Sequence, residues 1–128
     1  MNWKYVKPLK NELAVQTFLN QCNVILPDEL VSVIETYNGG RPEEKEIVTD
    51  AGREYVFKSL LSYNQDDKET IYTIYPELFV DSYLFPIGSD SAGDFICYDL
   101  KKQRPVLLNH ETNKIETIIK MPFDVMRT

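Results

Sequence analysis

The sequence has little of what catalytic and metal sites are built from. It contains one histidine, His110, and two cysteines, Cys22 and Cys97. A structural zinc site usually needs four Cys or His ligands. A nucleophile pair of Cys97 and His110 would join a residue of an apolar strand to one of a polar turn. We therefore predict no catalytic residues, no bound metal and no cofactor.

The sequence also lacks the signals of membrane insertion and secretion. No apolar run approaches 18 residues, which excludes a membrane-spanning helix. The start, Met1 to Tyr5, has no hydrophobic signal core, and no Asn-x-Ser/Thr acceptor for glycosylation occurs. Two unpaired thiols suit a reducing compartment. We expect a cytoplasmic protein without a membrane partner.

Basic residues are few and scattered. The chain has 14 Lys and Arg against 20 Asp and Glu, a net charge of −6, and its longest basic run is Lys101-Lys102. An acidic domain without a basic patch is a poor ligand for nucleic acid, whereas its field attracts a basic protein. The charge can also serve solubility alone, and both interpretations stay open.

Apolar spacing predicts two helices near the N-terminus. With 128 residues, the chain corresponds to one domain, 1–128. Apolar residues recur at helical intervals near 9–21 and at 27–37. Pro8 and Pro27 suit the first turns of these helices.

Two glycine-marked turns then shape the backbone. Asn38-Gly39-Gly40 can supply the left-handed conformation that ends the second helix, and Pro42 prevents the helix from resuming. In the second turn, Asp90 can bind the backbone of its own turn ahead of Gly93. We take Asn38, Gly39, Gly40, Asp90 and Gly93 as the residues that define these turns.

Most of the remaining chain reads as strands. Alternating or apolar runs at 47–49, 55–63, 84–87, 95–100, 105–108 and 115–119 are separated by polar turns, as in an antiparallel meander. Residues 69–75 have both strand propensity and helical spacing, and we favour one or two helical turns that end or kink at Pro76. The predicted class is α+β, with two N-terminal helices packed on a mostly antiparallel sheet.

In this order, the motifs resemble the SUKH superfamily. The resemblance runs through Trp3, Leu26-Pro27, Asn38-Gly39-Gly40, Phe85-Pro86-Ile87-Gly88 and Gly93-Asp94, and it spans nearly the whole chain. Members commonly have Gly-Asn or Gly-Gly where this chain has Gly93-Asp94. Most members also end in a Phe-containing helix, and the brief end Met121–Met126 predicts that this helix is short or absent.

The resemblance implies binding without chemistry. The superfamily groups fungal regulators of cell-wall synthesis with bacterial immunity proteins, which look like antidotes to polymorphic toxins, often nucleases. It therefore implies a non-enzymatic protein that neutralises a cognate toxin by direct binding. The alternative is an intracellular regulatory or scaffold adaptor without a toxin partner. The sequence leaves the oligomeric state open.

Two acidic runs and several tyrosines are the candidate partner contacts. The carboxylates would speed encounter with a basic toxin domain, and exposed tyrosines would act as anchors. Solvated loops and half-buried strand tyrosines are the simpler alternatives. The candidates are Glu43, Glu44, Glu46, Tyr63, Asp66, Asp67, Glu69, Tyr72, Tyr75 and Tyr83.

Overall fold

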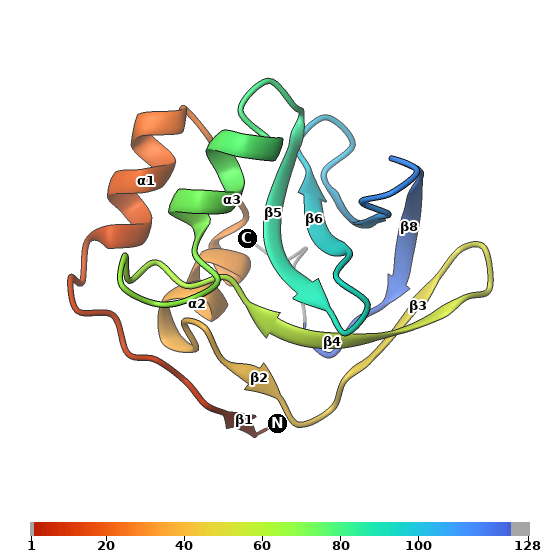
Figure 1. Ribbon diagram of the computed structural model, residues 1–128, viewed down its shortest axis with the longest axis horizontal. Coiled ribbons are helices and arrows are strands. Elements are labelled where there is room, and N and C mark those ends of the chain that lie inside the picture. The colour runs from red at the N-terminus through yellow and green to blue at the C-terminus, as the bar shows by residue number, and fades with distance from the viewer. Residues whose placement is uncertain (1, 124–128) are drawn as a thin grey trace.

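The computed structural model describes residues 2–123 and shows helices on one side of a strongly curved sheet (Figure 1). The expected α+β class is confirmed. Along the chain the elements are β1 (Trp3–Lys4), α1 (Ala14–Cys22), α2 (Asp28–Thr36), β2 (Arg41–Pro42), β3 (Glu46–Thr49), β4 (Glu54–Leu60), α3 (Ile71–Leu78), β5 (Leu84–Asp90), β6 (Phe95–Asp99), β7 (Arg104–Leu108) and β8 (Ile115–Lys120).

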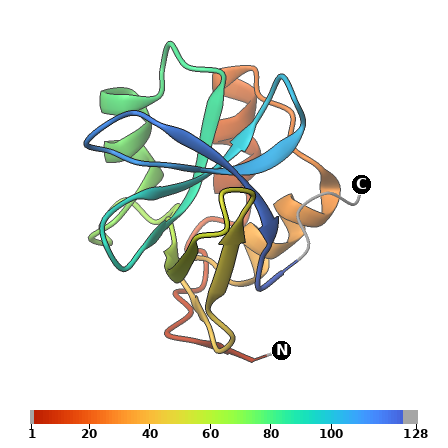
Figure 2. The ribbon, with the colours of Figure 1, turned by 90° about the vertical axis from the view of Figure 1, so that its right-hand side faces the viewer.

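The predicted antiparallel meander is present, and its two ends also pair with each other. Strands β3 to β8 follow one another in sequence order, and β8 returns to β3 to close a barrel. Val48 of β3 lies opposite Lys120 of β8, and Figure 2 shows the two strands side by side. Closure leaves no open edge in this six-stranded sheet. The short β1 and β2 form a separate antiparallel pair.

The helices pack on the barrel through their apolar faces, as the sequence predicted. Helix α1 buries Val15, Phe18 and Leu19, and α2 buries Leu30 and Ile34. They share one hydrophobic core with barrel residues such as Phe57, Phe85, Ile96 and Leu107. Helices α1 and α3 lie next to each other on the same side of the sheet (Figure 1).

The first helix begins later than its apolar pattern suggested. It starts at Ala14 rather than near residue 9, so Pro8 does not lie in its first turn. The side chain of Asn11 accepts a hydrogen bond from the Leu13 N–H at 2.9 Å. Local bonds of this kind satisfy the backbone outside a helix, which is why Asn is common ahead of helix starts.

Helix α3 confirms the helical interpretation of residues 69–75 and continues through Pro76 to Leu78. The hydroxyl of Thr70 accepts the Thr73 N–H at 3.3 Å and caps the first turn. Pro76 has no N–H for the Tyr72 carbonyl, so one helical bond is missing. The predicted bounds 69–75 are shifted, because the helix begins at Ile71 and ends at Leu78.

The Asn38-Gly39-Gly40 turn has the left-handed residue that was predicted after α2, because Gly39 has a φ of 67°. Asn38, in contrast, acts through its side chain. Position 40 requires glycine because neighbouring atoms lie too close to leave room for a side chain. A Cβ on Gly40 would lie 2.7 Å from the Tyr37 carbonyl oxygen and 3.0 Å from Cγ2 of Val6.

The second turn confirms the predicted role of Asp90. Its Oδ1 accepts the N–H groups of Ala92 at 3.0 Å and of Asp94 at 2.8 Å, and Gly93 has a φ of 89°. Strand β5 runs into this turn as far as Asp90, beyond the predicted end at Ile87. The predicted shortening of the C-terminal helix concerns residues that lie mostly outside the described part of the chain.

The steric role of Gly40 can be tested by adding one methyl group. Gly40→Ala forces the Cβ against a backbone oxygen that cannot move without breaking the turn, so we expect a loss of more than about 2 kcal/mol in the free energy of unfolding. Gly52→Ala is the control. It has positive φ but no atom within 4 Å of the new Cβ, and strain alone should cost about 1 kcal/mol. Urea denaturation of both variants gives the comparison, and equal losses would contradict a steric role.

Candidate functional site

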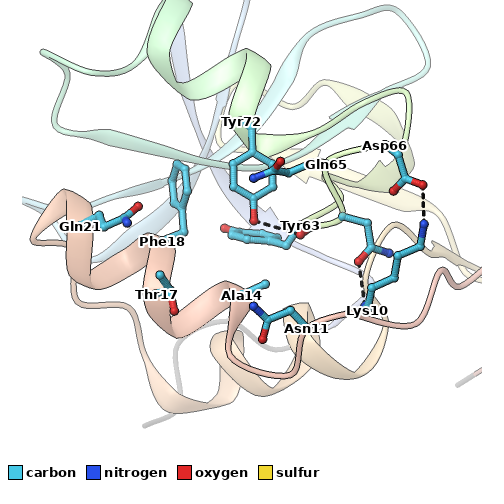
Figure 3. Close-up of a pocket in the computed structure, with 11 residues that line it drawn as sticks. Lys10, Asn11, Ala14, Thr17, Phe18, Gln21, Tyr63, Gln65, Asp66 and Tyr72 are labelled. Carbon is cyan, nitrogen blue, oxygen red and sulfur yellow. Dashed lines mark hydrogen bonds and ion pairs between the residues drawn. The ribbon is translucent and has the colours of Figure 1, made fainter.

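A hollow of about 550 Å³ opens between α1, the segment after β4 and the start of α3 (Figure 3). Its apolar walls come from one face of α1 and from aromatic rings on the other two elements. Its rim carries hydroxyl and amide groups together with one ion pair. The lining residues are Lys10, Asn11, Ala14, Thr17, Phe18, Gln21, Tyr63, Asn64, Gln65, Asp66 and Tyr72.

Three aromatic rings form the walls. Phe18 stands nearly perpendicular to Tyr63 and to Tyr72, with ring centroids 5.8 Å and 5.5 Å away. Edge-to-face pairs of this kind contribute about 0.5–1.5 kcal/mol beyond their buried area. The Tyr72 hydroxyl donates to the Tyr63 carbonyl at 3.0 Å and fixes α3 to the segment opposite. The walls are therefore rigid.

Asn38 holds the segment that carries Tyr63. Its side chain is fully buried at 0% exposure. Nδ2 donates to the Lys7 carbonyl at 2.8 Å and to Oγ of Ser62 at 3.1 Å, and Oδ1 accepts the Tyr63 N–H at 2.8 Å. One amide thus ties the N-terminal arm to the wall of the hollow.

The side-chain amide of Asn64 also binds the backbone of the N-terminal arm. Nδ2 donates to the Pro8 carbonyl at 3.0 Å, and Oδ1 accepts the Lys10 N–H at 3.0 Å. Strand β4 ends at Leu60 rather than at Tyr63, because Ser62 leaves the barrel and bridges to Thr70. The segment between β4 and α3 therefore takes its shape from side-chain bonds.

The structure brings together three of the predicted contact residues, Tyr63, Asp66 and Tyr72, at this hollow. The expectation that Tyr63 is exposed is wrong, because its ring packs in the core and only 3% of the residue is exposed. Burial raises the pKa of its hydroxyl, with smaller contributions from Tyr72 and Cys22. This hydroxyl is buried and has no hydrogen-bond partner among residues 2–123.

The other predicted tyrosines lie elsewhere. Tyr75 is half-buried and packs against Phe18 with a centroid distance of 5.5 Å, so it borders the same aromatic cluster. Tyr83 is 41% exposed and lies outside the hollow. The ammonium of Lys101 lies 4.8 Å from the centroid of its ring. Tyr83 is therefore the most exposed of the four candidates.

Neighbouring cations compensate two of the three carboxylates in the run Asp66–Glu69, whereas Asp67 accepts a hydrogen bond from the Ser62 hydroxyl. Asp66 pairs with Lys10, and this hydrogen bond lowers the pKa of its carboxyl. Burial opposes ionisation of Glu69, but Lys58, at 2.5 Å, with help from Ser89, outweighs burial and lowers the pKa of the Glu69 carboxyl. Beside them a second hollow, of about 460 Å³, is lined by these carboxylates and by Lys7, Arg41 and Lys68.

The chain matches a model of a known protein family. A family model described as SMI1-KNR4 cell-wall, SUKH_6, matches residues 12–124. The chain belongs to the SUKH family. Neither the curated proteins nor the solved structures gave a significant match.

The second acidic run of this SUKH domain is only partly free. Glu46 pairs with Lys120 at 2.5 Å. Glu43 and Glu44 are exposed and form no ion pair within the described residues. None of the three lines the aromatic hollow. Their role as partner contacts stays a prediction.

A second acidic region, on the helices, was missed by the analysis of charged runs. From Asn11 to Gly40 the chain contains no Lys, Arg or His, yet it carries Glu12, Asp28, Glu29 and Glu35. No ion pair to these four carboxylates occurs within the described part of the chain. Asp28 and Glu35 line a groove of about 270 Å³ between α1 and α2. A count of cations along the sequence, rather than of clustered carboxylates, would have found this surface.

The groups considered for chemistry are occupied in structural roles. Cys97 is fully buried in β6, and burial raises the pKa of its thiol. Nδ1 of His110 lies 2.6 Å from Oδ1 of Asp94 and joins the turn after β7 to the turn before β6. Among the described residues, no three potential ligands cluster as a metal site, and no helix is long and apolar enough to span a membrane. SUKH proteins are generally non-catalytic.

The Asn38 amide can be tested with an isosteric change. Asn38→Asp keeps the acceptor for the Tyr63 N–H but removes both donors, so the Lys7 carbonyl keeps only the longer bond from Nδ2 of Asn64, at 3.4 Å, beside a buried carboxylate. We expect the free energy of unfolding to fall by about 2–4 kcal/mol. Asn20→Asp, on the exposed face of α1, is the matched control and should change it by less than about 0.5 kcal/mol. A small loss for Asn38→Asp in chemical denaturation would refute its central role.

Proposed function

We propose that this SUKH domain is an immunity protein that neutralises a cognate toxin domain by direct binding. Family membership carries the proposal, because the family includes toxin immunity proteins. The geometry supports recognition rather than reaction. Its rigid aromatic hollow lies beside helices that carry uncompensated negative charge, while its thiol and imidazole candidates serve the fold.

A basic toxin domain is the partner that best suits the charge of this protein. Nuclease domains, which bind polyanions, are often basic. The acidic side of α1 and α2 would attract such a domain over a long range, and steering of this kind raises association rates by about 10- to 1,000-fold. Within residues 2–123, the α2 carboxylates Asp28, Glu29 and Glu35 form no ion pair that would weaken their field. Glu43 and Glu44 add to the same attraction.

The tyrosines would then hold the complex together. Half-buried Tyr72 and Tyr75 and exposed Tyr83 offer large rings that lose little side-chain entropy on contact. Such residues are enriched among those that dominate binding energy. In this proposal, the carboxylates mainly determine the association rate and the aromatic contacts mainly determine the dissociation rate.

Complex formation can be tested with the polypeptide that the adjacent gene encodes. We expect the C-terminal domain of that polypeptide to co-purify with this protein at one-to-one stoichiometry. We also expect co-expression to relieve the growth arrest that this domain causes alone. If the two neither co-purify nor affect growth together, a regulatory adaptor is the better interpretation.

The electrostatic part of the proposal predicts a difference between two triple variants. Asp28→Asn/Glu29→Gln/Glu35→Gln should slow association more than Glu43→Gln/Glu44→Gln/Glu46→Gln, because Lys45 and Lys120 already compensate the loop. The difference should shrink between about 20 mM and 300 mM salt as screening grows. Stopped-flow association rates measure it, and equal, salt-independent rates would disprove steering by α2.

A further inference from the structure

The aromatic hollow is electrically neutral inside an acidic protein. Its lining contains one cation, Lys10, and one carboxylate, Asp66, and these two pair with each other. The other lining groups are aromatic rings, an alanine methyl, a threonine hydroxyl and side-chain amides. A charged side chain would lose its water here without gaining an unpaired opposite charge. The lining therefore favours an uncharged occupant.

The walls favour a ring. Phe18 and Tyr72 meet at 83°, and Figure 3 shows the rings of Phe18, Tyr63 and Tyr72 gathered around the same space. A further ring that enters this space can add edge-to-face contacts on several sides. The volume of about 550 Å³ falls in the range of about 300–1,000 Å³ found for ligand sites. The hollow is large enough for one aromatic side chain and part of its backbone.

The polar groups favour a ring with a hydrogen-bonding edge. The Tyr63 hydroxyl is buried too deeply for an occupant of the hollow to reach, so a hydrogen bond to the occupant has to come from the rim. The exposed amides of Asn11, Gln21 and Gln65 stand at the rim and can donate or accept.

We propose that the hollow receives a tryptophan or tyrosine side chain of a protein partner. The indole N–H or the phenol hydroxyl bonds to a rim amide, while the ring packs against Phe18, Tyr63 and Tyr72. The existence of a protein partner rests on the proposed function. A nucleobase has similar chemistry, but its phosphates would face Asp66, Asp67 and the net charge of −6.

Small probes test the hollow without knowledge of the partner. We would titrate ¹⁵N-labelled protein with N-acetyl-tryptophanamide, N-acetyl-tyrosinamide, N-acetyl-phenylalaninamide, N-acetyl-argininamide and uridine monophosphate. The first two should shift the amide signals of Phe18, Gln65 and Tyr72 at millimolar concentrations, and argininamide and the nucleotide should not. Tighter binding of the arginine probe or of the nucleotide at these signals would overturn the proposal.

One pair of variants locates the binding. Thr17→Tyr places a ring at the rim, on the exposed side of α1, and should abolish probe binding, whereas Gln16→Tyr, beside the α1–α2 groove, should leave it intact. The phenylalanine probe, which has no polar edge, should bind more weakly than the tryptophan probe. Equal binding of these two probes would refute the hydrogen-bond assignment, and binding that survives Thr17→Tyr would overturn the proposal.

The stability of Thr17→Tyr separates this result from misfolding. Because Thr17 is exposed, the substitution should leave the unfolding midpoint unchanged, so a loss of probe binding reflects a blocked hollow. Probes that bind when no toxin complex forms would support the hollow and refute the proposed function. A toxin complex that Thr17→Tyr does not weaken would refute the hollow instead.

Discussion

The buried amide of Asn38 is the interaction on which both fold and site depend. It lies just after α2 and bonds to the N-terminal arm through Lys7 and to the segment after β4 through Ser62 and Tyr63. The backbone contributes only a few bonds between these three parts: the short β1–β2 pair, and the bond from the Lys7 N–H to the Asn38 carbonyl at 2.8 Å. A buried amide that satisfies all its partners fixes one arrangement and penalises every other. The helices and the barrel are thereby joined at the place where the aromatic hollow opens.

Regular elements could be predicted because their signals are local. Apolar spacing located α2 to within a residue at each end, and polar turns separated the strands near their observed bounds. Barrel closure was not predictable in this way, because the pairing of Val48 with Lys120 joins residues far apart in sequence and leaves no mark in either strand. The late start of α1 has a similar cause. Asn11 and Asn64 bind backbone there, and only the folded chain brings Asn64 near.

The candidate site was predictable in composition but less so in role. The sequence drew attention to Tyr63, Asp66 and Tyr72, and all three line the hollow. It could not show that Tyr63 would be buried or that Lys10 would compensate Asp66, because both depend on contacts more than 40 residues apart or on packing in the core. We expected Asn38 to act through its backbone conformation in the turn, yet its side-chain hydrogen bonds are what hold the neighbouring segments together. A short motif gives the residue types at a turn but not the partners of their side chains.

Helix α1 separates two kinds of surface that binding proteins often combine. On one side, Thr17 and Phe18 face a neutral hollow with aromatic walls, and on the other, the groove toward α2 is lined by Asp28 and Glu35 and, among the described residues, by no cation. Salt screens charge beyond about one Debye length, near 8 Å at physiological salt, so the α2 carboxylates guide a basic partner most effectively at low salt and during its approach. The hollow acts only on contact, where ring packing and desolvation determine how long a complex lasts. A partner could thus lose charge and bind more slowly, or lose an aromatic anchor and dissociate faster, and the two changes would be nearly independent.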